Sequence, residues 1–413
     1  MRILMTSYEF PPIGGGGAAV VAGLSRQLVS RGHHVDLVTM RFRECPDRET
    51  LDGVEIHRVP CFRRAKHVCT TPEALSYVAG AMPVIRRLLA ANHYDVTHAH
   101  FILPDGLLAW RIWRTTGLPY VITAHGTDVP GYNPHRLRLA HRLVRPLWKM
   151  VVRNAQRIIC PSTILEQLVQ AQRPGARKTL VIPNGLEPGA YTPRGDKPRV
   201  LVVTRMLERK GVQHLLASLA QSPIEPEVNI VGDGPYLPEL KRQAEQLNSP
   251  ANFIGWLDNR SPQLHQLYET SSIFVFPSEA ENFPMVLLEA MAAGLAIITT
   301  EGTGCAEVVG DAGLLVPPRD PQAIGQALRR LIDDHELRRT LGAAARRRIE
   351  ENFTWQAVAT RYLDEYAQQG ASGGNGRRPR PSPDATSLLT TESGAVGFFA
   401  AAAGLSSYLA QFC

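Results

Sequence analysis

The stretch Ser272–Thr300, SIFVFPSEAENFPMVLLEAMAAGLAIITT, constrains the fold more strongly than any other part of the chain. Ile273–Phe276 is apolar at every position, which is typical of a central strand covered on both faces of a parallel sheet. A short acidic loop follows, and then a helix predicted over Pro284–Ala293 with Gly294 as its C-terminal cap. Leu295–Thr300 is predicted as the next strand. This order predicts an α/β fold, in which ligands gather at the carboxyl ends of the strands.

Two carboxylates mark this segment, Glu281 at the entrance of the helix and Glu289 eight residues later. Eight helical residues span about 12 Å, so the two groups cannot share one proton or one metal ion. They suit opposite ends of an extended ligand, and the helix N-terminus between them favours phosphate. A nucleoside diphosphate sugar fits this arrangement, with one carboxylate accepting hydrogen bonds from sugar hydroxyls and the other from the ribose diol.

A structural interpretation of the same carboxylates stays open at this point. In that interpretation Glu281 only stabilises the helix dipole, a contribution of about 0.3–1 kcal/mol. Glu289 is harder to explain in this way, because it lies within the apolar run Met285–Ala293 and an unpaired buried carboxylate is costly. The spacing by itself favours neither interpretation.

Residues 277–300, PSEAENFPMVLLEAMAAGLAIITT, resemble the E-x7-E signature of the family 4 retaining glycosyltransferases. That family has the GT-B fold, so the resemblance implies two Rossmann-like parallel-sheet domains that face a central cleft. It implies that Glu281 holds the hydroxyls of the transferred sugar and that Glu289 anchors the ribose. The other donor-binding positions that it implies in this segment are Asn282, Phe283, Met285 and Val286.

One departure from the family pattern concerns the sugar site. The family usually carries E-G-F-G where this chain has Glu281-Asn282-Phe283-Pro284. An asparagine tolerates a left-handed backbone, but Pro284 has no amide N–H to donate. The resemblance therefore does not fix the contacts to the sugar hydroxyls or the identity of the donor sugar.

An arginine and a lysine follow another predicted strand, Val200–Thr204. Arg205 and Lys210 lie five residues apart on the loop after it, where an arginine fork and a lysine point charge can clamp a diphosphate. This segment resembles the family's GR-x(4)-KG phosphate clamp, with Thr204 in place of the usual glycine. Residues 253–257, FIGWL, resemble the family's base-contacting loop, which implies that Leu257 lies against the nucleobase.

The predicted strand Tyr120–Thr123 is followed by a polar segment, HGTD at 125–128. A lone histidine at such a position is more often structural than catalytic. The HG-x-D pattern, however, resembles the segment that carries the family's cleft histidine. The resemblance implies that His125 orients or stabilises the sugar and that Asp128 lies on the acceptor side.

A glycine run separates the predicted strand Arg2–Thr6 from the predicted helix Ala18–Ser30. Glycines at a helix start let the backbone approach a phosphate closely, and the resemblance implies donor contacts at Gly16 and Gly17. A dinucleotide-binding alternative exists, because residues 14–19 fit G-x-G-x-x-A and Asp36 follows about 20 residues later. The long loop with two prolines and the position of Asp36 inside a predicted strand argue against that alternative.

A chain of 413 residues is too long for one hydrophobic core, so two domains are expected. The resemblance to the GT-B fold implies an N-terminal acceptor-side Rossmann-like domain over 1–190 and a nucleotide-sugar-binding Rossmann-like domain over 191–350. It also implies that a helix over 351–368 crosses back to the N-terminal domain. Residues 369–413 are predicted to be a disordered tail, in which Ala395–Phe412 is only weakly apolar.

The cysteines and the N-terminus predict a cytoplasmic protein. The six cysteines are scattered and form no CxxC pair, which predicts reduced thiols and no structural zinc site. We expect no signal peptide, and no apolar run long enough to span a membrane in the first 368 residues.

Positive charge is concentrated in the first half of the chain. Residues 1–190 hold 24 Lys and Arg against 13 Asp and Glu, whereas the remainder holds 21 against 25. The predicted helix Arg136–Arg153 joins basic residues to an apolar face, which is typical of docking on an anionic membrane surface. The alternative is an ordinary solvated helix face. Nucleic acid is not an expected partner, because the segment lacks interleaved aromatic residues.

Together these motifs predict a retaining glycosyltransferase that moves a sugar from a UDP- or GDP-type donor to a lipid-linked or saccharide acceptor in cell-envelope glycan or glycolipid synthesis. The expected mechanism is same-face attack, with the leaving phosphate taking the acceptor's proton. No D-x-D occurs in the sequence, and basic side chains with helix dipoles can neutralise the leaving diphosphate, so neither a metal ion nor a cofactor is expected. The alternatives are a GT-B sugar-nucleotide epimerase or phosphorylase and a non-catalytic nucleotide-sugar binding protein.

Overall fold

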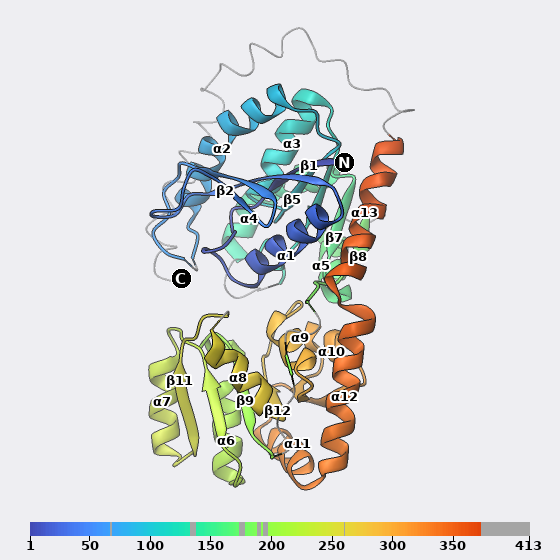
Figure 1. Cartoon of the computed structure of the whole chain (residues 1–413). Coiled ribbons are helices and arrows are strands. Elements are labelled where there is room, and N and C mark those ends of the chain that lie inside the picture. Colours follow the sequence, from blue (N-terminus) through green and yellow to red (C-terminus); the bar gives the residue numbers. More distant parts are fainter. Residues whose placement is uncertain are drawn as a thin grey trace. The chain divides into compact units, whose positions relative to one another are not determined.

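The computed structural model describes residues 1–66, 68–132, 138–172, 178–187, 191–192, 197–259 and 261–372. The chain divides into two compact units (Figure 1). The first unit comprises Met1–Pro161, Leu165–Ile182 and the chain from Ala359 onward, and the second comprises Ser162–Ile164 and Pro183–Val358. The main passage from the first unit to the second therefore follows Ile182, whereas the sequence placed the boundary at residue 190.

Helix α13 (Trp355–Ser372) begins in the second unit and belongs to the first from Ala359 onward. It covers most of the segment 351–368 that was predicted to cross back. It also continues to Ser372, past the predicted end of the crossing helix at residue 368. Residues 373–413, including the apolar segment Ala395–Phe412, lie outside the described residues.

The first unit is built on an eight-stranded sheet in the order β3-β4-β2-β1-β5-β6-β7-β8. Every neighbouring pair is parallel except β3 with β4, which is antiparallel. The strands are β1 (Arg2–Thr6), β2 (His34–Met40), β3 (Arg48–Leu51), β4 (Val54–Val59), β5 (Val96–His100), β6 (Tyr120–Thr123), β7 (Arg157–Cys160) and β8 (Thr179–Val181). The helices are α1 (Gly16–Ser30), α2 (Thr71–Ala91), α3 (Asp105–Thr116), α4 (Arg138–Asn154), α5 (Thr163–Gln172) and α13.

Consecutive residues of the central strands are buried in the first unit, which explains their continuous apolar runs. Ile3, Leu4 and Met5 of β1 are all inaccessible to solvent. Leu4 packs in one cluster with Tyr77 of α2 and other residues of α2 and α3. A second cluster joins β5, β6 and β7 to α4 through residues such as Trp148. Both clusters lie on one face of the sheet, because Leu4 is in register with Thr97, two residues before Ala99 of the second cluster. The opposite face is covered by α13, whose Tyr366 hydroxyl lies 2.7 Å from Nδ1 of His98, so helices lie on both faces, as parallel sheets require.

Helix α2 is long and apolar enough to cross a membrane by length and composition, and it is the one such helix among the described residues. No such run was expected from the sequence in the first 368 residues, and α2 meets the criterion of length and composition alone. Tyr77, Ala81 and Ile85 on one side of α2 pack in the core of the first unit. A core helix of a soluble protein passes the same test, so this finding is weak evidence for a membrane span.

The second unit is built on a six-stranded parallel sheet in the order β11-β10-β9-β12-β13-β14. The strands are β9 (Val200–Val203), β10 (Val228–Val231), β11 (Ala251–Gly255), β12 (Ile273–Phe276), β13 (Ala296–Thr300) and β14 (Gly313–Val316). The helices are the short 3₁₀ turn η1 (Glu208–Lys210), α6 (Val212–Gln221), α7 (Leu237–Gln246), α8 (Pro262–Thr270), α9 (Met285–Ala292), α10 (Gly304–Val309), α11 (Pro321–Asp333) and α12 (His335–Asn352).

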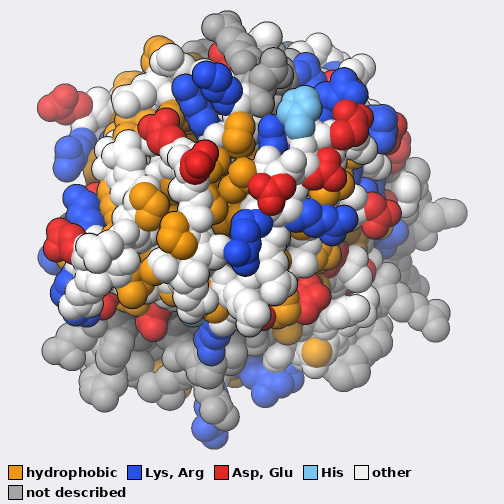
Figure 2. All heavy atoms as spheres, turned by 90° about the horizontal axis from the view of Figure 1, so that it is seen from below, with side chains coloured by type: hydrophobic (Ala, Val, Ile, Leu, Met, Phe, Trp, Pro, Cys, Tyr) orange, Lys and Arg blue, Asp and Glu red, His pale blue; other side chains and the backbone are white. Residues whose placement is uncertain are grey.

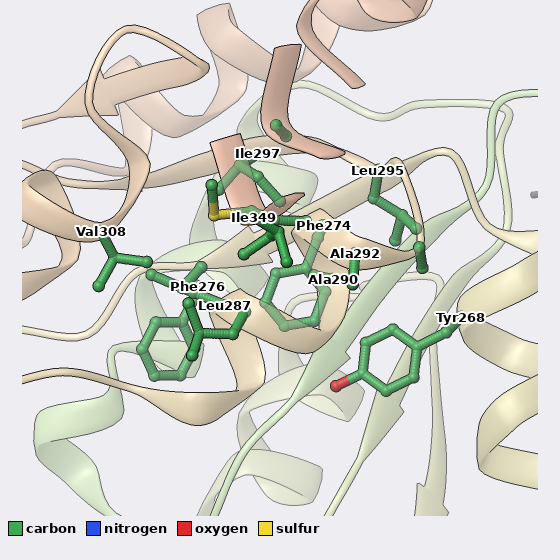
Figure 3. Packing of buried hydrophobic residues seen from close by; sticks show 14 of the residues in the cluster. Tyr268, Phe274, Phe276, Leu287, Ala290, Ala292, Leu295, Ile297, Val308 and Ile349 are labelled. Carbon is green, nitrogen blue, oxygen red and sulfur yellow. The ribbon is translucent and has the colours of Figure 1, made fainter. Parts of the chain in front are cut away.

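Strand β12 shows why its segment is apolar at every position. Ile273 and Val275 face a cluster formed with α6, α7 and α11. Phe274 and Phe276 face the opposite cluster, formed with α8, α9, α10 and α12 (Figure 3). Both side-chain directions of the strand therefore end in a hydrophobic core, and the prediction of a central buried strand is confirmed.

The helix after β12 is shorter than predicted. Pro284 has an extended backbone with ψ of 120°, so it precedes the helix, and its carbonyl accepts the hydrogen bond from the Leu287 amide. At the other end Gly294 adopts φ of +75° and donates its N–H to Met291. Leu295 donates its N–H to Ala290, which completes a Schellman motif. The predicted glycine cap is confirmed, and the following strand begins one residue later than predicted, at Ala296.

The face shown in Figure 2 lies below α6 and α11 in Figure 1. Its coloured part intersperses Lys and Arg with Asp and Glu, among scattered hydrophobic side chains. This mixture agrees with the nearly balanced charge of the chain after residue 190.

Candidate active site

The strand order of the second unit reverses between β9 and β12, which are neighbours in the sheet. In a doubly wound sheet, such a switch point opens a crevice at the carboxyl ends of the two strands. The loop after β9 carries η1, and the loop after β12 leads to α9. Gly211, at φ of +73°, brings the loops together, because a Cβ on it would lie 2.0 Å from the carbonyl oxygen of Pro277. Only glycine fits this approach.

Lys210 and Glu281, predicted separately, form an ion pair across this switch point. Ser278 adds a hydrogen bond from its hydroxyl to the same Glu281 oxygen at 2.6 Å. The two charged side chains are 12% and 9% exposed, so the pair is largely removed from water. The Lys210 ammonium also lies 5.2 Å from the centroid of the Phe276 ring. The site therefore holds one positive and one negative group that are both largely removed from water and neutralise each other.

Backbone hydrogen bonds hold the two loops in register. The carbonyl of Arg209 accepts a hydrogen bond from the Glu279 amide at 2.8 Å, and its guanidinium donates to the carbonyl of Ala280 at 3.0 Å. Arg205, the other predicted clamp residue, is exposed on the loop after β9. Ser278 was not predicted as a site residue. The sequence feature that could have indicated Ser278 is its hydroxyl group, directly after Pro277, which ends the strand.

The residues between Glu281 and α9 are held by the rest of the second unit. The side-chain oxygen of Asn282 accepts a hydrogen bond from the Ser162 hydroxyl at 2.5 Å. Phe283 packs edge-on against Phe353, with ring centroids 5.5 Å apart. Both predicted donor-binding side chains are therefore buried and engaged with protein. The first turn of α9, with Met285 and Val286 partly buried, contains no acidic residue.

Glu289 lies on α9 and accepts a hydrogen bond from the hydroxyl of Tyr268 on α8 at 2.9 Å. In Figure 3, the hydroxyl of Tyr268 points away from α8 toward the cluster that includes α9 residues. Burial raises the pKa of Glu289 to about 7, although the hydrogen bond from Tyr268 opposes the shift. Glu281 and Glu289 thus have separate partners, as expected for groups that do not share a proton. Leu257, predicted to contact the base, packs on the same cluster.

The strand order of the first unit reverses between β1 and β5, which creates a second switch point. Helix α1 begins after the loop that follows β1. Its N-cap residue is Gly15, so no side chain accepts a hydrogen bond from the first amides of the helix. A Cβ on Gly17 would lie 2.9 Å from the ring of Phe101 and 3.5 Å from Nδ1 of His125. The structure therefore places the imidazole of His125 beside the glycine turn, where Gly16 and Gly17 were predicted to contact the donor.

Asp128 has a different environment from the one its prediction implies. Its Oδ1 accepts hydrogen bonds from the amides of His125 and Gly126 at 3.0 and 2.9 Å, and its Oδ2 accepts one from the amide of Ile102 at 2.8 Å. Burial raises the pKa of Asp128 against the lowering effect of these hydrogen bonds. This geometry favours a carboxylate that fixes the loop carrying His125. A direct acceptor contact by Asp128 stays a prediction.

The dinucleotide alternative depends on Asp36, which lies near the amino end of β2 and not at its ligand-binding edge. Its carboxylate accepts hydrogen bonds from Arg2, His57 and Tyr94 at 2.9–3.0 Å. These contacts join neighbouring parts of the sheet. A cofactor ribose would need this carboxylate at the opposite end of the strand, so the structure argues against the alternative.

Helix α4 has one buried side and one basic, exposed side. Trp148 and Val151 are buried in the core of the first unit. Leu143 is 51% exposed and stands among basic residues. The exposed basic side chains described on α4 are Arg142, Arg145, Lys149 and Arg153. Arg136 lies outside the described residues, as does the side chain of Arg138.

Comparisons with known proteins agree with this architecture. The model described as Glycosyltransferase Family 4 matches residues 14–189, and the model described as Glycosyl transferases group 1 matches residues 187–348. Glycogen synthase of Mycobacterium tuberculosis is 29% identical over 420 residues, which span 92% of this chain and 97% of that protein. Together the two models span most of the chain.

Solved structures show the same fold. Sucrose-phosphate synthase from Thermosynechococcus elongatus superposes with a TM-score of 0.77 at 24% identity, covering 90% of this chain and all of the other. A protein from Anabaena, in complex with UDP and glucose, superposes with a TM-score of 0.69 at 19% identity, covering 89% and 99%. Two parallel α/β units of this type define the GT-B class of glycosyltransferases. Within that class, the chain belongs to the family 4 glycosyltransferases.

Proposed function

We propose that the protein is a retaining glycosyltransferase that moves a hexosyl group from a nucleoside diphosphate sugar to a lipid-linked or saccharide acceptor. One observation carries the proposal, the cluster of Lys210, Glu281 and Ser278 at the switch point between β9 and β12. A cation, a carboxylate and a helix N-terminus in one crevice match the phosphate and the sugar of such a donor. The Anabaena structure with UDP and glucose supports this class of donor.

Donor binding replaces the ion pair of Lys210 and Glu281. The diphosphate takes the ammonium of Lys210 and the guanidinium of Arg205, and the sugar hydroxyls donate to Glu281. Because both charges of the Lys210–Glu281 pair are already largely out of water, the exchange adds little new desolvation cost for the protein. Glu289 accepts hydrogen bonds from the ribose diol. The hydroxyl of Tyr268 either moves away or donates to the same carboxylate at the same time.

Sugar transfer proceeds on one face of the donor. The bond between the anomeric carbon and the phosphate oxygen breaks, and the acceptor oxygen forms its bond to the same face of that carbon. The departing phosphate oxygen takes the acceptor's proton. Arg205, Lys210 and the N-terminus of α9 neutralise the charge that develops on the diphosphate, so the reaction needs no metal ion. His125 donates a hydrogen bond to the donor.

A panel of nucleotide sugars tests this proposal. Wild-type protein is incubated with UDP-, GDP- and ADP-sugars and with candidate acceptors, and the released nucleotide and the product's anomeric configuration are measured. We expect release with one base type, retention of configuration, and at least about a hundredfold loss of kcat in Glu281→Gln. Glu279→Gln, two residues away on the same loop, is the matched control and keeps most activity.

Each alternative gives a distinct outcome in the same assay. An epimerase changes the donor sugar without releasing a diphosphate, and a phosphorylase requires inorganic phosphate. A non-catalytic binding protein retains the donor unchanged. An inverted product, or equal losses in Glu281→Gln and Glu279→Gln, contradicts the proposed mechanism.

We further propose that the enzyme works in the cytoplasm and docks peripherally on an anionic membrane surface. The exposed basic side of α4 supports this, since each basic residue near such a surface contributes about 1 kcal/mol. Phe62 supports it as well, because this side chain is 77% exposed in a loop that also carries Arg64 and Lys66. An aromatic ring beside cations suits the boundary between headgroups and acyl chains.

Co-sedimentation with vesicles tests the membrane proposal. We expect binding to vesicles that contain phosphatidylglycerol, little binding to pure phosphatidylcholine, and a decrease with salt. Replacing Arg142 and Arg145 with Ser weakens binding. The control replaces Arg329 and Arg330, exposed on α11 of the second unit, and changes the charge equally. If sedimentation does not depend on lipid charge, or if both double variants weaken vesicle binding equally, the basic side of α4 is only a solvated surface.

A further inference from the structure

Three histidines of the first unit, two of them fully buried and one partly buried, form a series toward the carboxyl edge of its sheet. The rings of His98 and His100, both on β5, lie 4.2 Å apart between centroids. Nδ1 of His100 lies 3.1 Å from Nε2 of His125, which is hydrogen-bond distance. His98 and His100 are completely buried. The sequence motif that carries His125 was used above, but His98 and His100 have no place in the proposed function.

The hydrogen bonds of His98 are complete. Its Nδ1 lies 2.7 Å from the hydroxyl of Tyr366, and its Nε2 lies 2.9 Å from the hydroxyl of Thr123. A neutral imidazole has one donor and one acceptor nitrogen, so both nitrogens of His98 are satisfied. This residue holds α13 against β5 and β6 within the first unit.

His100 differs, because its Nε2 is buried and has no hydrogen-bond partner within the described structure. Buried polar atoms without a partner are rare, and each needs an explanation. The next residue, Phe101, also needs an explanation, because it has a bulky side chain and nevertheless adopts φ of +79°. Such backbone strain concentrates at functional sites. The ring of Phe101 lies against His125, with centroids 4.3 Å apart.

These contacts leave one nitrogen of His125 for a ligand. His100 occupies Nε2, Phe101 covers one side of the ring, and Asp128 fixes the backbone amide of His125. The nitrogen that remains, Nδ1, lies beside Gly17 at the start of α1. Burial lowers the pKa of His125 to about 3, so the ring is neutral at physiological pH and carries a single proton.

The position of that proton follows from the unpartnered nitrogen of His100. If His125 donated from Nε2, the proton of His100 would lie on its own Nε2 as a buried N–H without an acceptor, which proteins avoid most strongly. If His100 donates from Nδ1, its Nε2 is left as a bare lone pair, and the proton of His125 lies on Nδ1. The positive end of α1 opposes a proton on Nδ1 of His125, whereas an oxygen anion bound there favours it.

We propose that His100 is a positioning residue that donates to Nε2 of His125 and thereby makes Nδ1–H of His125 a hydrogen-bond donor aimed at an oxygen of the donor substrate. Nδ1–H and the first amides of α1 then converge on the same acceptor atom, which is a phosphate or sugar oxygen. The inference deepens the function proposed above and rests on it for the identity of this substrate.

Nitrogen NMR of histidine-labelled protein reads the proton position directly, with or without enzymatic activity. We expect the His125 spin system to show a protonated Nδ1 and an unprotonated Nε2, both in the free protein and with UDP bound. His100→Asn keeps a donor near the position of Nδ1 and is expected to preserve this pattern. His100→Phe removes the donor and is expected to shift His125 toward a proton on Nε2. Unshifted signals in His100→Phe, or a protonated Nε2 in the wild type, overturn the proposal.

Kinetics provide the second readout. His100→Phe is expected to lower kcat about tenfold or more with a smaller change in the KM of the donor, and His100→Asn is expected to recover most of the loss. Exposed His93 provides the control His93→Asn, which should match the wild type. Circular dichroism spectra that match the wild type show that each variant keeps its fold. If both His100 variants lose equal activity while the NMR pattern is kept, His100 is structural only. Absence of any transfer by the wild type refutes the proposed function and leaves the NMR result to decide this inference.

Discussion

Glu289 is expected to couple nucleotide binding and stability to pH, and Glu289→Gln is the variant that tests this. Burial raises the pKa of this carboxyl group in the folded protein to about 7, whereas its ordinary value is 4.5. The folded protein therefore holds a proton that the unfolded chain releases between these two pH values. Stability from this group is complete below pH 4.5 and is lost as pH rises through 7.

The size of this loss of stability follows from the difference between the folded and unfolded pKa values of Glu289, because each pKa unit corresponds to about 1.4 kcal/mol. Wild-type protein is expected to lose about 3 kcal/mol of unfolding free energy through this group as pH rises from about 4.5 to above 7. Glutamine does not ionise, so the variant lacks this loss. Urea unfolding of both proteins at matched pH values measures the difference, which should grow in favour of Glu289→Gln toward high pH.

Nucleotide binding is expected to respond in the opposite sense, because the ribose diol donates hydrogen bonds and the ionised carboxylate is the better acceptor. With a pKa of about 7, roughly one tenth of Glu289 is ionised at pH 6, so affinity should rise about tenfold between pH 6 and pH 8. Calorimetry with an intact nucleotide sugar measures this rise and the proton released at pH 6. The variant should show neither. A wild-type affinity that does not change with pH, or the same change in Glu289→Gln, refutes the assignment of Glu289 to the ribose.

Three further predictions concern the phosphate clamp and its loops. Arg205→Ala and Lys210→Ala are each expected to weaken nucleoside diphosphate binding by about 1.5–3 kcal/mol, the scale of a hydrogen bond to a charged group; unchanged calorimetric affinity in both removes the clamp. Gly211→Ala is expected to destabilise the second unit by at least about 1 kcal/mol, since its Cβ would lie 2.0 Å from the carbonyl of Pro277, and an unchanged melting temperature contradicts this. Transfer is expected to continue in EDTA, and turnover that stops there and returns with added Mg²⁺ excludes the metal-free mechanism.

The parts of the fold that the sequence predicted are those whose cause is local. Four consecutive apolar residues indicate a strand buried on both faces, and β12 has that environment. Gly294 indicates a helix end, and it adopts the left-handed backbone that a Schellman motif requires. Pro284 was placed inside the helix because proline is common at a first helical position, but its extended ψ places it just before the helix. Such ends are decided by one backbone torsion, which composition does not determine.

Long-range partners were the part that the sequence did not predict. Asp128 looked like a ligand-binding carboxylate, yet it accepts hydrogen bonds from the amides of His125 and Gly126, its own near neighbours. An aspartate that bonds back to neighbouring amides is a known turn pattern, so this role had a local signal. The donation from Ile102 had none, because it depends on the adjacency of β5 and β6.

The pair of Lys210 and Glu281 shows most clearly what a sequence motif leaves out. The two residues are 71 positions apart, and their separate motifs assign one to phosphate and the other to sugar. The order of β9 and β12 in the sheet places them together, and the contact of Gly211 with Pro277 fixes the distance between their loops. Because each charge is buried against the other, neither can be removed without leaving its partner uncompensated, which typically costs about 3–5 kcal/mol. In the proposed function, the same pairing selects a ligand that brings both a negative group for the lysine and hydroxyl donors for the glutamate. A free phosphate meets the first requirement and a free sugar meets the second. A nucleoside diphosphate sugar meets both at once.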